Sequence, residues 1–295
     1  MIINNFENNR LTVSFNDHSG APLSGAQGSP GCLALPSDLF ASIIKKSHRF
    51  GLSVFIAGRY STLEESAKMK KELVIFQGKE RMFNLKKARE TQQRLSSLIS
   101  LNFSGEEITR IGAVDCSYDF GRQRIAAVVV VFEIASLRLI EEVESQDKIP
   151  LPYIPGFLNF REAPVILKAW RKLAHRPDVL LVDGNGIAHP RRMGLASYVG
   201  LLLDQPTIGC AKSPFFPYEP PEKERGSISP YFNDRGEQVG LCVRTRTGIK
   251  PVFVSPGHKM DIPTAGRIVL NLAKYRLPEP LRVAHQQAQK IFKKK

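Results

Sequence analysis

Apolar residues recur with two different spacings along the chain, and the order of these spacings predicts strands followed by alternating strands and helices. Between residues 108 and 145, three runs rich in β-branched residues are separated only by short polar breaks such as "DFGRQ". Strands connected so tightly are expected to be antiparallel neighbours. After residue 160, two segments with helical spacing alternate with the apolar strands "DVLLVD" and "TIGCA". We therefore expect one mixed sheet with helices on its faces.

The remaining pattern completes the sheet. Two further strands are expected at "VGLCVRT" and "KPVFVS", and a last helix at "IPTAGRIVLNLAKY". An antiparallel meander that continues into strand–helix–strand units is the order of a ribonuclease-H-like α/β fold. We predict that fold class, with an N-terminal extension preceding it.

The pattern changes at both ends of the chain. Residues 16–31, "NDHSGAPLSGAQGSPG", are rich in Gly, Ser and Pro, which predicts a flexible segment. No catalytic pattern precedes residue 86, so we interpret residues 1–85 as a partly flexible extension and residues 86–285 as one folded domain. Residues 286–295 end in "KIFKKK" and are expected to form a basic tail.

Composition narrows the setting of the protein. The 295 residues are 42% hydrophobic and 24% charged, which suits a folded domain with a sizeable core. No apolar run has the length of a membrane span, and the first residues resemble no secretory or organellar signal. The four cysteines, Cys32, Cys116, Cys210 and Cys242, form no C-x-x-C pair. This spacing argues against a zinc site and for a reducing compartment, so we expect a cytoplasmic protein without a membrane partner.

The net charge of +14 favours a polyanionic partner. Lysine and arginine attract nucleic acid through phosphate contacts and counterion release. A general solubility charge would give the same composition, so the charge alone leaves both interpretations open.

Two aspartates stand on predicted strands. Asp115 interrupts the apolar strand "IGAVDCSY", where it either faces water at an edge or needs a partner, since a buried unpaired acid is costly. Asp183 ends "VLLVD" and precedes Gly-Asn-Gly. It is either part of an ordinary Asp-Gly turn or a ligand position at the carboxyl end of a strand.

A third acid, Glu162, follows the proline-braced segment "PYIPG" in "PYIPGFLNFREAP". With Asn159 it could form a capping box, but Pro164 lacks an N–H and would break a helix that had begun earlier. We therefore expect the helix to begin near Glu162. Three carboxylates from two strands and a helix start can hold divalent cations that activate water, and oxygen ligands favour Mg²⁺ or Mn²⁺ over zinc.

Two basic side chains and one further acid lie near predicted strand ends. Lys212 follows "TIGCA", where it either contacts a phosphate or faces water as most loop lysines do. His258, in "SPGHKMD", is a candidate metal ligand or water-orienting group. Asp261 is interpreted as the N-cap of the last helix and is left out of the site.

At these residues the chain resembles the endonuclease V, or deoxyinosine 3′-endonuclease, family. The resemblance covers residues from about 86 to about 283. Six segments carry it in the family's order, namely "GAVDCSY", "PYIPGFLNFREAP", "LLVDGNGIAHPRRMGLASYVGLLLDQPTIGCAKS", "RGSISP", "RTRTGIKPVFVSPGHKMD" and "KYRLPEP".

The resemblance implies a metal-dependent endonuclease of DNA repair that recognises deoxyinosine. It implies hydrolysis of the second phosphodiester bond 3′ to the lesion, leaving a 3′-hydroxyl and a 5′-phosphate. Mg²⁺ is the implied cofactor, Mn²⁺ can substitute, and inosine-containing DNA is the implied partner of a monomeric enzyme. By motif match, the catalytic positions are Asp115, Glu162, Asp183, Lys212 and His258, of which the three acids bind metal.

The same resemblance assigns residues that handle the strand. The wedge that enters the gap left by the displaced base corresponds to Pro152, Tyr153, Ile154 and Pro155. The base pocket corresponds to Gly184, Asn185, Gly186 and His189. Asn185 and Ile228 depart from the family pattern, where another polar residue and an aromatic are expected. A rigid aromatic loses little entropy on insertion, and glycines let backbone groups approach a flipped base.

Three alternatives stay open at this stage. An inosine-specific endoribonuclease would carry the same motifs, because contacts to the 2′-hydroxyl leave no short signature. A non-catalytic nucleic-acid-binding protein on the same fold would be expected to have lost an acid, yet all three are present. Residues 1–85 are either a true accessory segment, or the start codon has been assigned too far upstream and Met82 is the real initiator.

Overall fold

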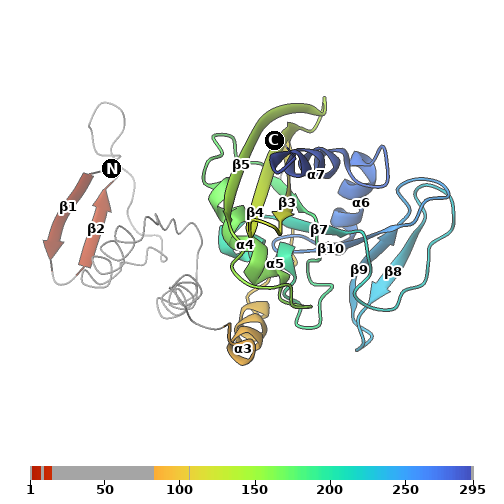
Figure 1. Cartoon of the computed structure of the whole chain (residues 1–295), viewed down its shortest axis with the longest axis horizontal. Helices are drawn as coiled ribbons and strands as arrows, with labels where there is room; N and C mark the ends of the chain where they lie inside the picture. Colours follow the sequence, from red (N-terminus) through yellow and green to blue (C-terminus); the bar gives the residue numbers. More distant parts are fainter. Residues whose placement is uncertain (1, 8–9, 15–82, 106, 294–295) are drawn as a thin grey trace. The chain divides into compact units, whose positions relative to one another are not determined.

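The computed structural model describes residues 2–7, 10–14, 83–105 and 107–293. The chain divides into two compact units, Met1–Glu80 and Arg81–Lys295. In the first unit, β1 (Ile2–Glu7) and β2 (Arg10–Ser14) pair as an antiparallel hairpin (Figure 1). The segment 16–31, predicted to be flexible, lies outside the described residues.

The second unit is built on one mixed eight-stranded sheet, which confirms the predicted fold class. Its strands lie in the order β5-β4-β3-β6-β7-β10-β9-β8. Their bounds are β3 (Arg110–Asp119), β4 (Arg124–Glu133), β5 (Arg138–Lys148), β6 (Val179–Val182), β7 (Thr207–Ala211), β8 (Ile228–Phe232), β9 (Gln238–Val243) and β10 (Val252–Pro256). The pairs β3–β6 and β6–β7 are parallel and the other neighbours are antiparallel. The tightly joined strands β3, β4 and β5 form the expected meander.

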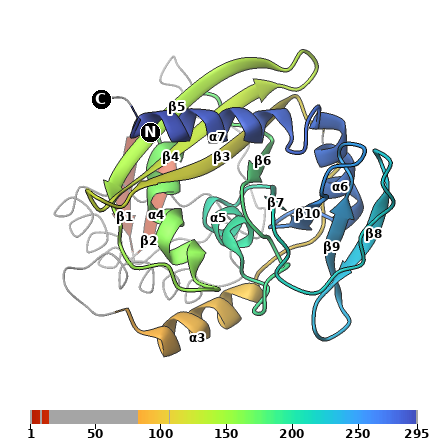
Figure 2. The ribbon, with the colours of Figure 1, turned by 45° about the vertical axis from the view of Figure 1, so that its right-hand side comes forward.

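Five described helices accompany the sheet. They are α3 (Leu85–Ser96), α4 (Leu158–Trp170), α5 (Leu195–Leu203), α6 (Ile262–Leu272) and α7 (Glu279–Ile291). Helix α4 packs on β4 and β5 and against α5, and α5 packs on β6 and β7. Helix α6 packs on β9 and β10, and α7 lies across β3, β4 and β6 (Figure 2).

Strand β4 is buried on both faces of the sheet, between helices α4 and α7. Its eight residues from Ile125 to Phe132 are all buried, as expected of a β-branched strand between two layers of helices. On β3, Ile111 and Ala113 share a hydrophobic core with Ala284 and Ala288 of α7. Alternation along the strand then places Asp115 on the α7 side and Tyr118 on the opposite side.

Helix α4 begins earlier than the sequence predicts. It runs from Leu158, and Pro164 lies inside it. Asn159 does not cap the helix, because its Oδ1 accepts a hydrogen bond from Gln92 Nε2 at 2.9 Å. Burial of the residues around the first turn, including Phe160 and Glu162, outweighs the single backbone hydrogen bond that the proline removes.

The C-terminal boundary is also different from the prediction. Residues 286–291, expected to belong to a basic tail, continue α7, and Ala288 is fully buried. Ser117 Oγ of β3 donates a hydrogen bond of 2.6 Å to the Ala288 carbonyl. At the start of α6, Asp261 is the N-cap as predicted, accepting from the Thr264 N–H at 2.7 Å.

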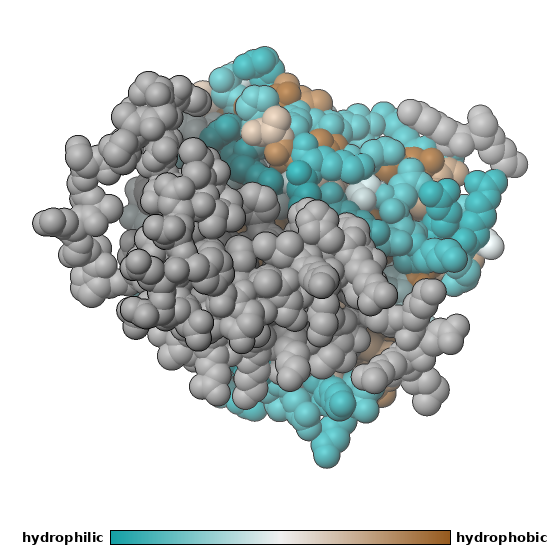
Figure 3. Space-filling model, turned by 90° about the vertical axis from the view of Figure 1, so that its left-hand side faces the viewer, coloured by the Kyte–Doolittle hydropathy of each residue, from teal (hydrophilic) through white to brown (hydrophobic). Residues whose placement is uncertain are grey.

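One face of the molecule carries mainly polar side chains among its described residues (Figure 3). On the face shown in Figure 3, the visible described residues are mainly hydrophilic, with scattered hydrophobic spots. Among the described helices, none combines the length and apolar character that crossing a membrane requires.

Candidate active site

The two aspartates come together because β3 and β6 are parallel neighbours in register. Val114 pairs with Val182, so the next residue on each strand, Asp115 and Asp183, stand side by side. The Asp183 N–H donates to the Val114 carbonyl at 3.2 Å, which extends this register by one residue. The sheet itself therefore fixes the separation of the two carboxylates.

A histidine that the sequence analysis did not single out completes the group. His285 Nδ1 lies 2.6 Å from Asp115 Oδ2. Ligand atoms of Asp115, Asp183 and His285 all lie within 4.8 Å of one another, a spacing that suits one metal ion. The signal was present in α7: Leu281 and Ala284 face the core, and position 285 is one turn beyond Leu281 on that face.

Burial and like charge perturb the acids in the same direction. Burial raises the pKa of Asp115 above its ordinary value, and the charge of Asp183 raises it further, while His285 and Lys212 lower it. Two carboxylates this close repel each other when both are ionised. A divalent cation would relieve that repulsion.

Glu162 belongs to α4, on the other side of β3, and is not among the three residues whose ligand atoms lie within 4.8 Å of one another. Tyr118 Oη donates a 2.5 Å hydrogen bond to Glu162 Oε1. Burial raises the pKa of Glu162 to about 8; the charges of Asp115 and Asp183 also raise it, whereas Tyr118 and Arg161 lower it. The carboxyl group is thus held protonated near neutral pH unless a cation joins it.

Lys212, for which the sequence left open a phosphate contact or a place facing water, lies beside Asp183. It follows β7, which is the parallel neighbour of β6. Its Nζ is 2.5 Å from Asp183 Oδ2, and its charge lowers the pKa of Asp115. A cation beside two acids at the end of parallel strands is well placed to meet a phosphate.

The structure does not bring His258 to this cluster. Strand β10 is antiparallel to β7, with Pro256 opposite Ile208, so the loop after β10 lies at the beginning of β7. There the Ser100 N–H donates to His258 Nδ1 at 3.2 Å, and Nε2 is 3.5 Å from Asp204 Oδ1. Asp183, in contrast, follows β6, whose last residue Val182 pairs with Gly209 further along β7. The motif match alone did not show this separation.

The predicted wedge lies between β5 and α4 and is presented to solvent. The side chain of Tyr153 is 65% exposed. The next glycine, Gly156, has a φ of +79°, and a Cβ there would meet Arg191 Nη2 at 3.0 Å. Glycine is therefore required where the wedge segment turns into the helix.

One carbonyl joins the wedge segment to the predicted base pocket. The Gly156 oxygen accepts from Gln92 Nε2 at 2.9 Å and from Arg191 Nη2 at 2.9 Å, and it lies 3.1 Å from His189 Nε2. Arg191 Nε also donates to Gln92 Oε1 at 2.5 Å. The sequence analysis identified neither Arg191 nor Gln92, which is fully buried on α3. A glutamine on the buried side of a helix is nevertheless a sign of a hydrogen bond to another segment.

Of the residues predicted to read the base, Gly186 and His189 are buried, whereas Gly184 and Asn185 are partly exposed. Burial lowers the pKa of His189 to about 4, and the charge of Arg191 lowers it further, so the ring is neutral at pH 7. A Cβ on Gly186 would lie 2.1 Å from the Pro256 carbonyl oxygen, so this glycine is needed for backbone packing. Asn185 Oδ1 is buried and has no hydrogen-bond partner among the described residues.

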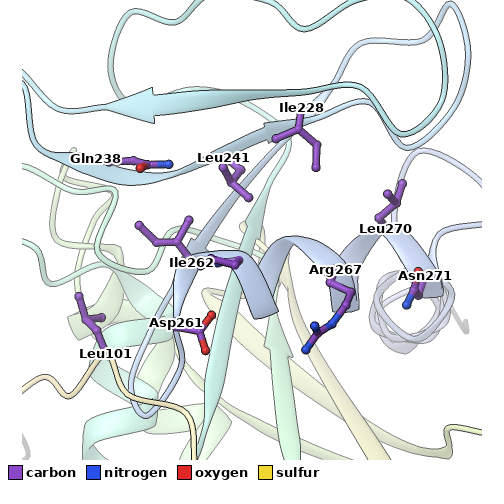
Figure 4. A pocket seen from close by; sticks show the side chains of 10 residues that line it. Leu101, Ile228, Gln238, Leu241, Asp261, Ile262, Arg267, Leu270 and Asn271 are labelled. Atoms are coloured by element: carbon purple, nitrogen blue, oxygen red, sulfur yellow. The ribbon is translucent and has the colours of Figure 1, made fainter. Parts of the chain in front are cut away.

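A cavity of about 650 Å³ lies elsewhere, between α6 and strands β8 and β9. Figure 4 shows its lining, in which the apolar side chains of Leu241 and Ile262 lie between the sheet and the helix. None of the three acids or Lys212 lines it. This cavity is therefore separate from the acids.

Comparison with known proteins gives a consistent result. A family model described as endonuclease V matches residues 93–286. Over 203 residues the chain is 45% identical to endonuclease V of Dictyoglomus turgidum, covering 68% of this chain and 88% of the relative.

Solved structures are similar over the same region. The crystal structure of endonuclease V from Streptomyces avermitilis is 40% identical, with a TM-score of 0.68, and the match covers 72% of this chain and 94% of that chain. Endonuclease V of Ciona intestinalis, in complex with a 24mer DNA containing an inosine followed by a ribo-adenosine, is 27% identical with a TM-score of 0.64. That match covers 71% of this chain and 98% of the Ciona chain.

Proposed function

Because this chain belongs to the endonuclease V family and is an endonuclease, we propose that it cuts DNA at deaminated adenine. The proposed reaction is metal-dependent hydrolysis of the second phosphodiester bond 3′ to deoxyinosine, leaving a 3′-hydroxyl and a 5′-phosphate. The observation that carries it is the group of Asp115, Asp183 and His285, whose ligand atoms lie within 4.8 Å of one another beside Lys212. The inosine in the DNA bound by the Ciona relative supports the choice of lesion.

The donor set fits a hard divalent cation. Asp115 and Asp183 offer carboxylate oxygens, which Mg²⁺ prefers, and the imidazole of His285 is equally compatible with Mn²⁺. Glu162 lies outside this group and is proposed as a further carboxylate ligand. Burial, followed by the charges of neighbouring acids, raises the pKa of Asp115 and of Glu162, so a cation bound beside them would favour their ionised forms. When bound, the metal supplies an activated water and stabilises the leaving oxygen.

The chain's own residues would orient and neutralise the substrate. Lys212, held by Asp183, is proposed to pair with the phosphate at the cut, where its charge offsets the charge that develops there. His285 is proposed to hold the Asp115 carboxylate in place through its 2.6 Å contact. Each of these two proposed roles rests on a contact seen in the structure.

Base recognition is proposed for the pocket beside the wedge. Tyr153, exposed and followed by a braced turn, would fill the gap left by the displaced base. Asn185 Oδ1 is a buried acceptor without a partner among the described residues, and hypoxanthine carries an N1–H that needs an acceptor. Neutral His189 and the backbone of Gly184 and Gly186 complete this proposed pocket.

A second candidate is an inosine-specific endoribonuclease. It is favoured by one observation, the ribo-adenosine that follows the inosine in the strand bound by the Ciona relative. A non-catalytic role is set aside because the family is one of endonucleases. We further propose that residues 86–291, through the end of α7, hold the whole activity and that the enzyme acts as a cytoplasmic monomer.

The experiment that tests the function compares matched DNA and RNA oligonucleotides carrying one inosine, with EDTA, Mg²⁺ or Mn²⁺. The parent should cut the DNA at the second bond 3′ to inosine only when a metal is present, and preferential cutting of the RNA would select the second candidate. Asp115→Asn and Asp183→Asn should each slow cleavage by at least about a hundredfold while binding survives in part. Asp234→Asn, at an exposed turn, is the matched control. Activity of either active-site variant within about tenfold of the parent would refute the metal assignment.

A further inference from the structure

A second cavity, of about 470 Å³, lies beside the predicted wedge and outside the group of acids. It lies among the β3–β4 turn, the segment after β5 and helix α4. Its lining includes Phe120, Gln123, Tyr153 and Arg161, with the segment Ile149–Pro152 closing it. Apart from the wedge residues Pro152 and Tyr153, no residue that lines it has a role proposed above.

An aromatic stack leads from the acids to the cavity. The ring of Tyr118, whose hydroxyl bonds Glu162, is stacked on the ring of Phe120 with centroids 5.4 Å apart and planes 5° apart. Phe120 is 64% exposed, and Tyr153, which lines the same cavity, is 65% exposed. A single exposed aromatic is ordinary, but two that line one cavity form a surface suited to stacking a flat ring.

Arg161 adds a buried cation to this surface. Only 4% of the residue is exposed, and its guanidinium carbon is 4.4 Å from the Tyr118 ring centroid and 5.8 Å from that of Phe120. Its Nε is buried and has no hydrogen-bond partner in the described part of the chain. A buried donor without an acceptor is costly, so a ligand that offers an oxygen here would be favoured.

The surroundings of the cavity are rich in positive charge. Arg122 and Arg124 belong to the β3–β4 turn and the start of β4, and Lys148 pairs with Arg124 across the sheet. All three are exposed. Asp119 and Asp147 also lie here, but Asp119 is 3.8 Å from Arg122, and Asp147 is paired with Lys168. The remaining charge attracts a polyanion.

We propose that this cavity is a stacking subsite for an unpaired nucleobase of the strand that the enzyme cuts. The base would stack on the free face of Phe120, and a keto or phosphate oxygen of the same nucleotide would accept from Arg161. The base must be unpaired because a paired base has both faces covered within the duplex. Every base offers a π-face, so the subsite is tolerant of sequence. That the base belongs to the strand that is cut rests on the proposed function. That a base stacks in this cavity does not depend on it.

Binding of single strands by the full-length protein tests the subsite. Fluorescence anisotropy in EDTA would compare labelled single-stranded DNA with and without one inosine. Phe120→Ala should raise the Kd for both strands by at least about fivefold, the lower end of what base–aromatic stacking contributes. Phe120→Trp should restore binding, and Phe232→Ala, which removes an exposed aromatic on β8, should leave it unchanged. Thermal melting checks that each variant is folded.

A fluorescent base analogue locates the stacked nucleotide. With 2-aminopurine moved through successive positions around the inosine, one position should be quenched on binding to the parent and to Phe120→Trp, and not to Phe120→Ala. Equal affinity of Phe120→Ala and the parent, or quenching that survives the alanine, would overturn the proposal. If the parent does not cut inosine strands but Phe120→Ala still weakens binding, the proposed function fails and the subsite stands.

Discussion

Replacing Glu162 with glutamine should remove most of the dependence of stability on pH in the metal-free protein. Glutamine keeps the shape of the side chain, and its Oε1 can still accept the hydrogen bond from Tyr118. The only large change is the loss of an ionisable group that is 7% exposed and close enough to Asp115 and Asp183 to respond to their charge. Burial, followed by those two charges, places the pKa of Glu162 at about 8 instead of 4.5.

The sign and size of the effect follow from that pKa. A group whose pKa is raised in the folded state stabilises the fold fully below the unfolded pKa, here about 4.5, and this contribution is lost as pH rises through about 8. At 1.36 kcal/mol per pKa unit, the loss is on the order of 5 kcal/mol. That is a large share of the stability of a typical domain.

Urea unfolding in EDTA between pH 5 and pH 8.5 measures this loss. The parent should lose stability across the range, and Glu162→Gln should lose much less. The difference between the two proteins removes the contribution of His189, whose lowered pKa of about 4 acts with the opposite sign and costs stability as pH falls. Added Mg²⁺ should raise the free energy of unfolding of the parent, and this increase should be largest near pH 8.5. Parallel curves for the two proteins would refute the assignment of Glu162 as a buried acid in need of a cation.

Three further outcomes are expected. Tyr153→Ala should weaken discrimination between inosine-containing and normal duplexes more than it slows cleavage of single-stranded inosine substrates, because a wedge matters where a stack must be opened; an equal loss on both would count against it. Gly186→Ala should cost about 2–4 kcal/mol in thermal or urea unfolding, since its Cβ would lie 2.1 Å from a backbone oxygen of β10, whereas Gly121→Ala, whose Cβ meets only Asp119 at 3.5 Å, should be close to neutral. A chain of residues 82–295 should fold and cut inosine-containing DNA at near-parental rates, because the second compact unit begins at Arg81. An insoluble or inactive 82–295 fragment, beside an active full-length protein, would show that the first residues are integral.

The sheet was predictable because its strands carry their own signal. The β-branched runs were enough to predict the three antiparallel strands. The alternation along β3 then predicts that Asp115 and its two sequence neighbours point to opposite faces of the sheet. The parallel pairing of β3 with β6, which brings Asp115 beside Asp183, followed only from the expected fold order. Such pairing joins residues distant in sequence, and no local pattern reports it.

The remaining site residues depended on tertiary contacts. The beginning of α4 was misplaced because Pro164 is a strong local signal that burial of the first turn overrides. His285 was missed because one histidine on an amphipathic helix looks like any polar residue at the edge of the apolar face. His258 was misplaced because a motif match does not show that β10 runs opposite to β7.

The carbonyl of Gly156 has a consequence for redesigning this enzyme. It takes hydrogen bonds from Gln92 and Arg191 and lies beside His189, so the proposed wedge and the proposed base pocket share one acceptor atom. A substitution at His189 that admits a different base would also shift the turn that carries Tyr153. Under the proposed roles, changes in base selectivity and in strand separation are coupled, and a library aimed at a new lesion should vary positions 92, 189 and 191 together.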